Sequence, residues 1–260
     1  MIELQNLSKR YGDGLAVDDV CLSVQRGEML VLVGGSGSGK TTTLKMVNRL
    51  IEPSAGEVRL NGRNVLQQPA WALRRSVGYC FQGVGLFPHL TVAENIGITP
   101  SLLGWPQARI RTRVDALLDL MALPAAAYRE RMPAQLSGGQ QQRIGVARAM
   151  AAQPDVVLFD EPFGALDPLT RDHLQAVLST IRRQEALTGI FVTHDMVEAF
   201  LLGDRIAVMQ GGRIIQVGTP HTLITAPINA YVEKLVTTPM RQSERIHDLF
   251  AAASHVQARS

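Results

Sequence analysis

An apolar run that leads into a glycine-rich segment constrains the fold of this chain more than any other feature. The run is Met29-Leu30-Val31-Leu32-Val33, and residues 34–41 after it fit the pattern G-x-x-x-x-G-K-[ST]. Leu44, Val47 and Leu50 then recur at helical spacing. A buried strand, a glycine turn and a helix are the context that a phosphate-binding loop requires. The sequence therefore predicts an α/β protein built around such a loop.

The loop residues suit the phosphates of a nucleotide. Glycines let successive backbone N–H groups converge on phosphate oxygens, where Cβ atoms would obstruct the approach, and the following helix adds the positive end of its dipole. Lys40 is expected to reach the β- and γ-phosphates, and the Thr41 hydroxyl to ligate Mg²⁺. The predicted nucleotide-binding residues here are Gly34, Gly35, Ser36, Gly37, Ser38, Gly39, Lys40, Thr41 and Thr42.

A second apolar run, Val156-Val157-Leu158-Phe159, ends in the carboxylates Asp160 and Glu161. Such a run alone is common in proteins. Together with the phosphate loop, however, it places two carboxylates at the carboxyl end of a sheet, where ligands bind in α/β folds. Asp160 is expected to hold Mg²⁺, usually through its water shell, and Glu161 to polarise the attacking water.

The remaining pattern predicts strands alternating with helices. Strands are expected at 2–10, 17–24 and 189–193, and a helix at about 170–187. The stretch 91–152 is predominantly helical and is interpreted as a lobe inserted into a parallel-sheet core. We expect one domain over residues 1–225 and a tail over 226–260 with two short helices at 231–236 and 244–253, and disorder after Ser254.

Composition limits the function classes. The chain has 260 residues, 46% of them hydrophobic, and a formal net charge of +3. It contains no run of five or more basic residues, so a nucleic-acid partner is not expected. It also lacks an apolar stretch of roughly 18 to 20 residues and an amino-terminal signal segment, so a cytoplasmic location is expected. Both cysteines, Cys21 and Cys80, lie in apolar runs and are expected to be buried.

The segment Leu136-Ser137-Gly138-Gly139-Gln140, placed between the phosphate loop and the acidic strand end, resembles the signature of the ATP-binding cassette (ABC) ATPases. The resemblance covers residues 2 to about 225. It implies a P-loop NTPase fold with a RecA-like parallel core, an antiparallel β subdomain and the helical lobe. It also implies ATP and Mg²⁺ as cofactors. Ser137, Gly138, Gly139 and Gln140 would complete the ATP site of a second copy, so a homodimer, or a pair with a second ATPase subunit, is expected.

The same resemblance implies roles for four further residues. Tyr11 matches the aromatic residue that stacks on adenine. Gln82 looks like the glutamine that contacts Mg²⁺ and the attacking water, and His194 looks like the histidine that touches the γ-phosphate. The segment Ala165-Leu166-Asp167 is similar to the loop that crosses the dimer interface, where Asp167 would orient the partner's site. The predicted catalytic residues are Glu161, His194 and Gln82, and the predicted metal ligands are Thr41, Gln82 and Asp160.

Which task the ATPase drives is a separate question with three answers: a subunit of a membrane importer, a subunit of an exporter, or a soluble ATPase acting on nucleic acid or ribosomes. The third class expects a long coiled-coil insertion, twin cassettes or a strongly basic patch, and none is visible. The runs at 41–50, 85–92 and 160–168 resemble importers of glycine betaine, carnitine and choline, although the other two classes, and import of another small solute, stay open.

An importer of this kind implies two separate membrane permeases, an external substrate-binding protein and a peripheral position on the cytoplasmic side of the inner membrane. The region Phe87-Pro88-His89 is expected to receive a coupling helix of the permease, or else to be ordinary packing of the lobe. Two residues depart from the resemblance, since Gly35 replaces a frequent proline and Gly83 a frequent polar residue. The residues after 226 are too few for the regulatory cystathionine-β-synthase (CBS) repeats that many relatives carry.

Overall fold

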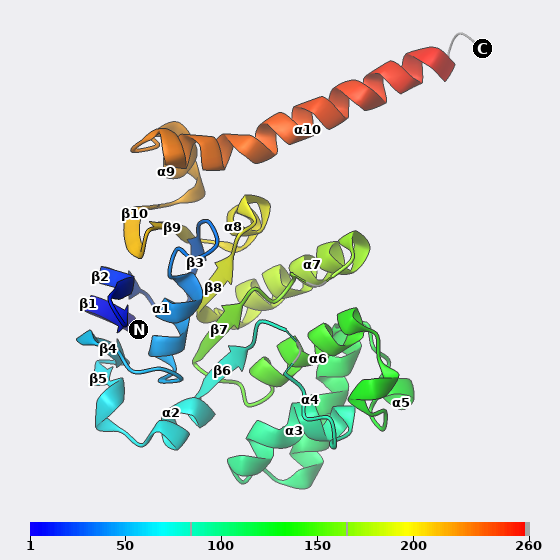
Figure 1. The fold of residues 1–260 in the computed structure, drawn as a ribbon. Helices are drawn as coiled ribbons and strands as arrows, with labels where there is room; N and C mark the ends of the chain where they lie inside the picture. Colours follow the sequence, from blue (N-terminus) through cyan, green and yellow to red (C-terminus); the bar gives the residue numbers. More distant parts are fainter. Residues whose placement is uncertain (84, 165, 258–260) are drawn as a thin grey trace.

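Two β-sheets organise the fold in the computed structural model, which describes residues 1–83, 85–164 and 166–257 (Figure 1). The larger sheet has six described strands in the order β10-β9-β3-β8-β7-β6. All neighbouring pairs are parallel except β10 with β9. The strands are β3 (Met29–Val33), β6 (Val77–Cys80), β7 (Val156–Asp160), β8 (Thr188–Thr193), β9 (Arg205–Gln210) and β10 (Arg213–Gly218). The predicted parallel core is thus confirmed.

The smaller sheet is antiparallel and has the order β2-β1-β4-β5. Its strands are β1 (Ile2–Tyr11), β2 (Gly14–Val24), β4 (Ala55–Leu60) and β5 (Arg63–Asn64). This sheet is the antiparallel subdomain that the resemblance implied. Its outer hairpin, β1–β2, lies beside the glycine loop, because the Asp18 N–H donates to the Gly212 carbonyl and the Gly212 N–H to the Ser38 carbonyl.

The register of the parallel strands places the carboxyl ends of β3, β7 and β8 at one edge of the larger sheet. Val33, the last residue of β3, pairs with Thr193, the last residue of β8, and Asp160 of β7 pairs with Val192. The residues that follow these strands therefore leave the sheet side by side. The catalytic residues predicted from the sequence follow strands that end at this edge.

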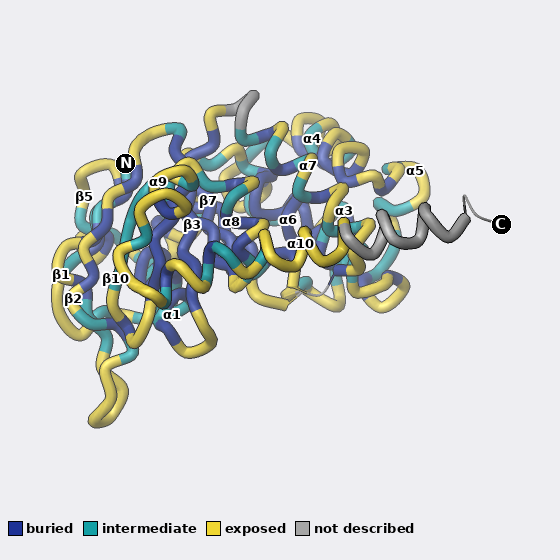
Figure 2. Tube along the Cα trace, turned by 90° about the horizontal axis from the view of Figure 1, so that it is seen from above, coloured by how far each residue is buried: buried dark blue, intermediate teal, exposed yellow. Residues whose placement is uncertain are grey.

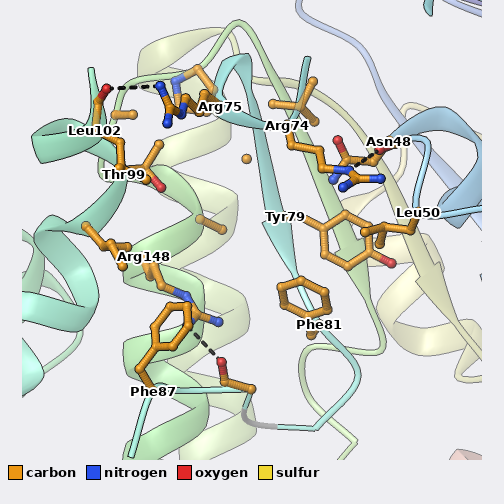
Figure 3. Close-up of a pocket in the computed structure, with 17 residues that line it drawn as sticks. Asn48, Leu50, Arg74, Arg75, Tyr79, Phe81, Phe87, Thr99, Leu102 and Arg148 are labelled. Atoms are coloured by element: carbon orange, nitrogen blue, oxygen red, sulfur yellow. Dashed lines mark hydrogen bonds between the residues drawn. The ribbon is translucent and has the colours of Figure 1, made fainter. Parts of the chain in front are cut away.

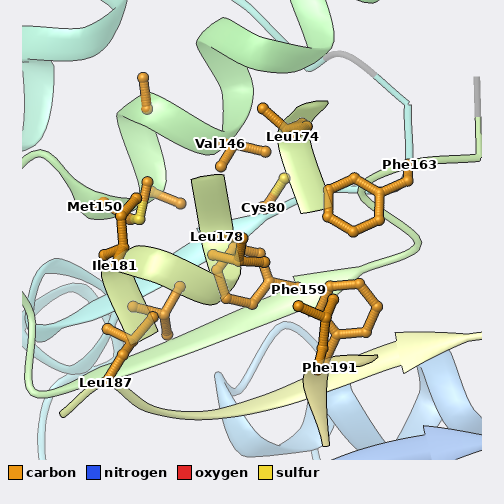
Figure 4. Packing of buried hydrophobic residues seen from close by; sticks show 14 of the residues in the cluster. Cys80, Val146, Met150, Phe159, Phe163, Leu174, Leu178, Ile181, Leu187 and Phe191 are labelled. Carbon is orange, nitrogen blue, oxygen red and sulfur yellow. The ribbon is translucent and has the colours of Figure 1, made fainter. Parts of the chain in front are cut away.

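The main sheet is buried on both faces, and side chains alternate between two cores with the period of two that strands impose. In β3, Met29, Val31 and Val33 belong to one core, whereas Leu30 and Leu32 belong to the other. The first core contains three aromatic rings, Phe159, Phe163 and Phe191, with centroids 5.4 to 5.7 Å apart in the pairs that include Phe191 (Figure 4). Phe163 lies two residues beyond Glu161, so this packing anchors the segment that carries the carboxylates.

The helical lobe occupies the stretch expected at 91–152 and lies away from β1 and β2 in Figure 1. It contains α3 (Val92–Leu102), α4 (Gln107–Leu120), α5 (Ala125–Tyr128) and α6 (Gly138–Met150). Ile110, Val114, Leu117 and Leu118 bury one face of α4, as the spacing predicted. The other helices are α1 (Lys40–Val47), α2 (Ala70–Ser76), α7 (Pro168–Glu185), α8 (Met196–Leu202), α9 (Pro220–Thr225) and α10 (Ala230–Gln257).

The tail differs from the expectation. One continuous helix, α10, replaces the two short helices at 231–236 and 244–253, and it continues past Ser254. Residues 230–257 contain no glycine that would end the helix, and Pro239 is accommodated within it. Val232 and Val236, in its first two turns, are buried, whereas the later part of the helix projects from the body (Figure 1).

Two smaller findings complete the description. Cys80 is buried as expected, but Cys21 is exposed because it lies on the outward face of β2. Among the described residues, no helix combines the length and the apolarity that crossing a membrane would need.

The aromatic cluster generates a stability prediction. Phe191 is fully buried between Phe159 and Phe163, so Phe191→Ala should lower the free energy of unfolding by about 3 to 5 kcal/mol through lost burial and a cavity. Urea denaturation followed by circular dichroism measures this. Ile228→Ala removes an exposed side chain and should change the free energy of unfolding by less than about 0.5 kcal/mol. Similar values for the two variants would contradict the assigned core.

Candidate functional site

The glycine loop joins β3 to α1, and two of its glycines are required by close approach of other backbone segments. A Cβ atom on Gly34 would lie 2.1 Å from the Met209 carbonyl oxygen. On Gly39, whose φ is +101°, it would lie 2.5 Å from the Ala16 carbonyl oxygen. The loop is therefore packed between β9 and β2, and its shape depends on residues without side chains at these positions.

Lys40 lies inside this loop. Its ammonium donates to the carbonyls of Gly34 at 2.8 Å and Gly35 at 2.9 Å, and to the Ser38 hydroxyl at 3.3 Å. Burial lowers the pKa of Lys40, and the nearby carboxylates Glu161 and Asp160 oppose that shift. Ser36 and Gly37 are exposed at the tip, while Thr41 and Thr42 are half-buried in the first turn of α1. The loop thus presents backbone and a single buried cation to an anion.

Asp160 and Thr41, both predicted as metal ligands, are adjacent. The Thr41 hydroxyl donates to Asp160 Oδ1 at 2.7 Å, and the Tyr79 hydroxyl donates to Oδ2 at 3.3 Å. Burial raises the pKa of Asp160, whereas these two hydrogen bonds lower it. A carboxylate and a hydroxyl are oxygen ligands of the kind that Mg²⁺ takes, together with waters and phosphates. Because this pair supplies two oxygens, it fits a metal ion that takes its other ligands from phosphate and water.

The three predicted catalytic residues come together at the same edge. Glu161 Oε2 lies 3.3 Å from His194 Nδ1 and accepts a hydrogen bond from Gln82 Nε2 at 3.5 Å. The Glu161 backbone has a φ of +47°, a conformation that costs free energy for a non-glycine residue and is often found at functional sites. Its N–H donates to the Val192 carbonyl at 3.0 Å. The turn after β7 therefore aims this carboxylate at His194, whose side chain is 64% exposed.

The signature residues occupy the start of α6. Ser137 is the N-cap, because its Oγ accepts from the Gln140 N–H at 3.3 Å while Gln140 Oε1 accepts from the Ser137 N–H at 3.0 Å. Ser137 and Gly138 are exposed, and Gly139 is half-buried. In the described chain no hydrogen bond joins these residues to the glycine loop, and α6 and α1 lie apart in Figures 1 and 2. The fold thus does not bring signature and loop together within one copy.

Asp167 and Tyr11 occupy exposed positions. Asp167 caps α7 by accepting from the Thr170 N–H at 3.0 Å, and this hydrogen bonding lowers the pKa of its carboxyl group. Ala165, named in the same predicted loop, lies outside the described residues. Tyr11 ends β1 with 54% of its surface exposed, and the Lys9 ammonium lies 5.2 Å from its ring centroid. Its ring is free to stack, but no hydrogen bond ties it to the glycine loop in the described structure.

Two side chains near the site were missed by the sequence reasoning. Tyr79 bonds Asp160, and Glu198 Oε2 accepts from the Thr193 hydroxyl at 2.6 Å, one residue before His194. Burial raises the pKa of Glu198. A signal existed for Tyr79, because a tyrosine in an apolar strand needs a partner for its hydroxyl. Glu198 lies on α8, a helix that the sequence reasoning did not assign.

Comparison with known proteins agrees with this geometry. The family model described as ABC transporter matches residues 17–164. The glycine betaine/carnitine/choline transport ATP-binding protein OpuCA of Bacillus subtilis is 48% identical over 91% of this chain and 62% of its own length. The glycine betaine uptake system ATP-binding protein YehX of Escherichia coli is 50% identical over 90% of this chain and 76% of its own length. This chain thus spans less than two thirds of the first relative.

A solved structure of an ABC transporter cassette has a similar fold. The dimeric structure of MJ0796, a bacterial ABC transporter cassette, superimposes with a TM-score of 0.78 and 33% identity, covering 84% of this chain and 98% of that one. The glycine loop, the Thr41–Asp160 pair and the signature at the start of α6 all lie in the part that the family model matches. By sequence, fold and site geometry, the chain belongs to the ABC transporter family.

Proposed function

We propose that this chain is the ATP-binding and ATP-hydrolysing subunit of a multi-subunit ABC importer for osmoprotectants such as glycine betaine, choline or carnitine. One observation supports the ATPase role above all. At a single sheet edge, the buried Lys40, the Thr41–Asp160 pair and the Glu161–His194–Gln82 group lie together. The substrate class rests on the relatives, whose names refer to glycine betaine, carnitine, choline and osmoprotectants. We assign the ATPase domain to residues 1–225 and the tail to 226–260.

In the proposed reaction, the loop N–H groups and Lys40 bind the β- and γ-phosphates. Lys40 then gives up its hydrogen bonds to the Gly34 and Gly35 carbonyls and donates to phosphate oxygens instead. Thr41, Asp160 and Gln82 would hold Mg²⁺, which when bound neutralises charge on the phosphates. Glu161 accepts a hydrogen bond from the attacking water and orients it, and His194 contacts the γ-phosphate. Water oxygen bonds to the γ-phosphorus and a water proton passes to the Glu161 carboxylate, while the bond to the β,γ-bridging oxygen breaks, which yields ADP and phosphate.

A second copy would complete each site. Because Ser137 and Gly138 are exposed and remote from the loop of their own chain, we propose that they face ATP bound to the partner. The amino terminus of α6 then directs unpaired N–H groups and the positive end of its dipole at the γ-phosphate. Asp167 would support the partner's site, and Tyr11 would stack on adenine. ATP thus joins two copies, and its cleavage removes the charge that holds them together.

A groove between α2, β6 and the helical lobe is the proposed docking place of a permease (Figure 3). It has a volume of about 470 Å³ and includes Phe81, Phe87, Ile98 and Leu102. Among the described residues, its lining contains Arg74, Arg75 and Arg148 but no Asp or Glu.

Arg148 adds a requirement for the occupant of this groove. Its side chain is 8% exposed, and its Nη1 donates to the Gly85 carbonyl at 2.8 Å. Its buried Nη2 has no hydrogen-bond partner among the described residues. Arg74 and Arg75 also line the groove and are less buried than Arg148, so we propose that a permease helix brings acceptor oxygens to these arginines. The chain would then lie on the cytoplasmic side of the membrane as a peripheral subunit.

Lys40→Ala tests the phosphate loop. No other described lysine lies among the loop carbonyls, so the variant should lose at least about 10²-fold in ATP hydrolysis, together with most ATP affinity. A phosphate-release assay and equilibrium binding of ATP measure the two effects. Lys234→Ala, which removes an exposed lysine of α10, should leave both unchanged. Near-normal hydrolysis by Lys40→Ala would refute the assignment.

Glu161→Gln tests the carboxylate and the dimer together. The amide keeps the size of the side chain but is a poor base, so hydrolysis should fall by about 10²- to 10⁴-fold while ATP binding persists. Light scattering with ATP should then detect a long-lived dimer. Adding Ser137→Arg should abolish that dimer, because a bulky cation would fill the exposed signature surface. A Glu161→Gln variant that stays monomeric in ATP would contradict the shared site.

Uptake of glycine betaine tests the proposed role in osmoprotectant import. The chain should be co-expressed with the permease and binding protein of a glycine betaine importer, and uptake of labelled glycine betaine at high osmolarity should require ATP and disappear in Glu161→Gln. Related import proteins named for sulfate/thiosulfate and for spermidine/putrescine are 44% and 43% identical to this chain. Uptake of sulfate or putrescine without glycine betaine would contradict the proposed substrate class, and outward transport would contradict import.

A further inference from the structure

The tail helix α10 touches the phosphate loop through one hydrogen bond. The Gly35 N–H donates to the hydroxyl oxygen of Tyr231 at 3.3 Å. The two residues are 196 positions apart in sequence. Tyr231 lies in the first turn of α10 and packs its half-buried ring against the larger hydrophobic core. Its hydroxyl is therefore held beside the loop by the packing of its ring.

The start of α10 is a fixed support for this hydroxyl. Val232 and Val236 are buried, and Asn229 accepts a hydrogen bond from the Val232 N–H at 3.0 Å through its side chain. The first turns of α10 also pack against α8. Tyr231 thus belongs to a part of the helix that is anchored to the body, unlike the projecting part beyond residue 240.

Both backbone polar groups of Gly35, its N–H and its carbonyl, form hydrogen bonds. Its carbonyl accepts from Lys40 Nζ at 2.9 Å and from the Ser38 N–H at 3.3 Å, whereas its N–H bonds Tyr231. The residue is exposed, and no atom lies within 4 Å of the position that a Cβ would take. A glycine in such open surroundings has large conformational freedom. In the described structure, the Tyr231 hydroxyl is the hydrogen-bond partner that limits this freedom on the N–H side.

We propose that Tyr231 is a positioning residue for nucleotide binding, which holds the Gly35 peptide and thereby pre-orders the phosphate loop. The inference rests on the proposed binding of ATP by that loop. A loop that is ordered before binding loses less conformational entropy when the phosphates bind. Removing the hydroxyl therefore weakens ATP binding without touching the groups that act in hydrolysis. The tail helix becomes a structural support of the nucleotide site.

Tyr231→Phe removes only the hydroxyl and keeps the packed ring. The loss of one hydrogen bond corresponds to a change of about two- to tenfold in an equilibrium constant. We expect the dissociation constant and the KM for ATP to rise by that factor, with kcat at saturating ATP unchanged. A general loss of stability would not produce this separation of KM from kcat. Isothermal titration with ATP and a phosphate-release assay give the two quantities.

Thr238→Val is the matched control, because it removes a hydroxyl that binds only the Lys234 carbonyl of the same helix. It should leave ATP affinity unchanged. Two substitutions of Gly35, each combined with Tyr231→Phe, test whether the change in ATP affinity acts through this residue. Gly35→Ala keeps the N–H, so Tyr231→Phe should still weaken binding there, whereas Gly35→Pro lacks the N–H, so Tyr231→Phe should have no additional effect.

Three results would overturn the inference. They are unchanged ATP affinity in Tyr231→Phe, an equal loss in Thr238→Val, and an equal effect of Tyr231→Phe with and without the Gly35→Pro substitution. If Gly35→Pro does not fold, the inference is tested by comparing the ATP affinities of Tyr231→Phe and Thr238→Val. This comparison is made in the wild-type chain and in the Gly35→Ala variant. A wild-type chain that binds no ATP would be a failure of the proposed function itself, and titration of the wild type distinguishes the two cases.

Discussion

The hydrogen bond from the Thr41 hydroxyl to Asp160 joins two segments that are 119 residues apart in sequence, and the geometry of the site depends on it. It ties the first turn of α1 to the end of β7. Both carboxyl oxygens of Asp160 are used, because Tyr79 bonds the other one. This arrangement is possible because β3, β7 and β8 end at one edge of the sheet. A shift of one residue in any of these registers would reverse the direction of the side chains and separate the pair.

Much of this arrangement could be predicted from local patterns. The glycine loop has a sequence signature because glycine alone meets its steric demands at positions 34 and 39. The carboxylates could be placed because carboxyl ends of parallel strands share an edge. The apolar strand around Tyr79 indicated only that its hydroxyl needs a partner, not that the partner is Asp160. The Gly35–Tyr231 pair could not be predicted, because no local pattern around either residue points to the other. The continuous α10 was missed because the polar residues between 237 and 243 resemble a connection.

The groove around Phe87 bears on two interpretations that the sequence pattern left open. The region around Phe87 was expected either to receive a permease or to be ordinary packing. Arg148 Nη2 is buried without a hydrogen-bond partner among the described residues, but so are the Nε atoms of Arg49, Arg113, Arg143 and Arg171 elsewhere in the fold, so this atom does not distinguish the two interpretations. The stacking of Arg148 near Phe81 and Phe87, with the guanidinium carbon 6.0 and 5.8 Å from the ring centroids, fixes its orientation in the groove. The proposed role of the groove thus rests on its apolar lining and on the arginines at its surface.

The long tail helix has a structural consequence. With 28 residues and a rise of about 1.5 Å per residue, α10 is a rod roughly 42 Å long. Among the α10 residues whose burial the structure describes, Val232 and Val236 are buried, both lie in the first two turns, and Tyr231 lies beside them. The residues that hold the start of this rod against the body also hold the Tyr231 hydroxyl beside Gly35. The attachment of the tail helix and the order of the nucleotide loop are therefore one structural feature.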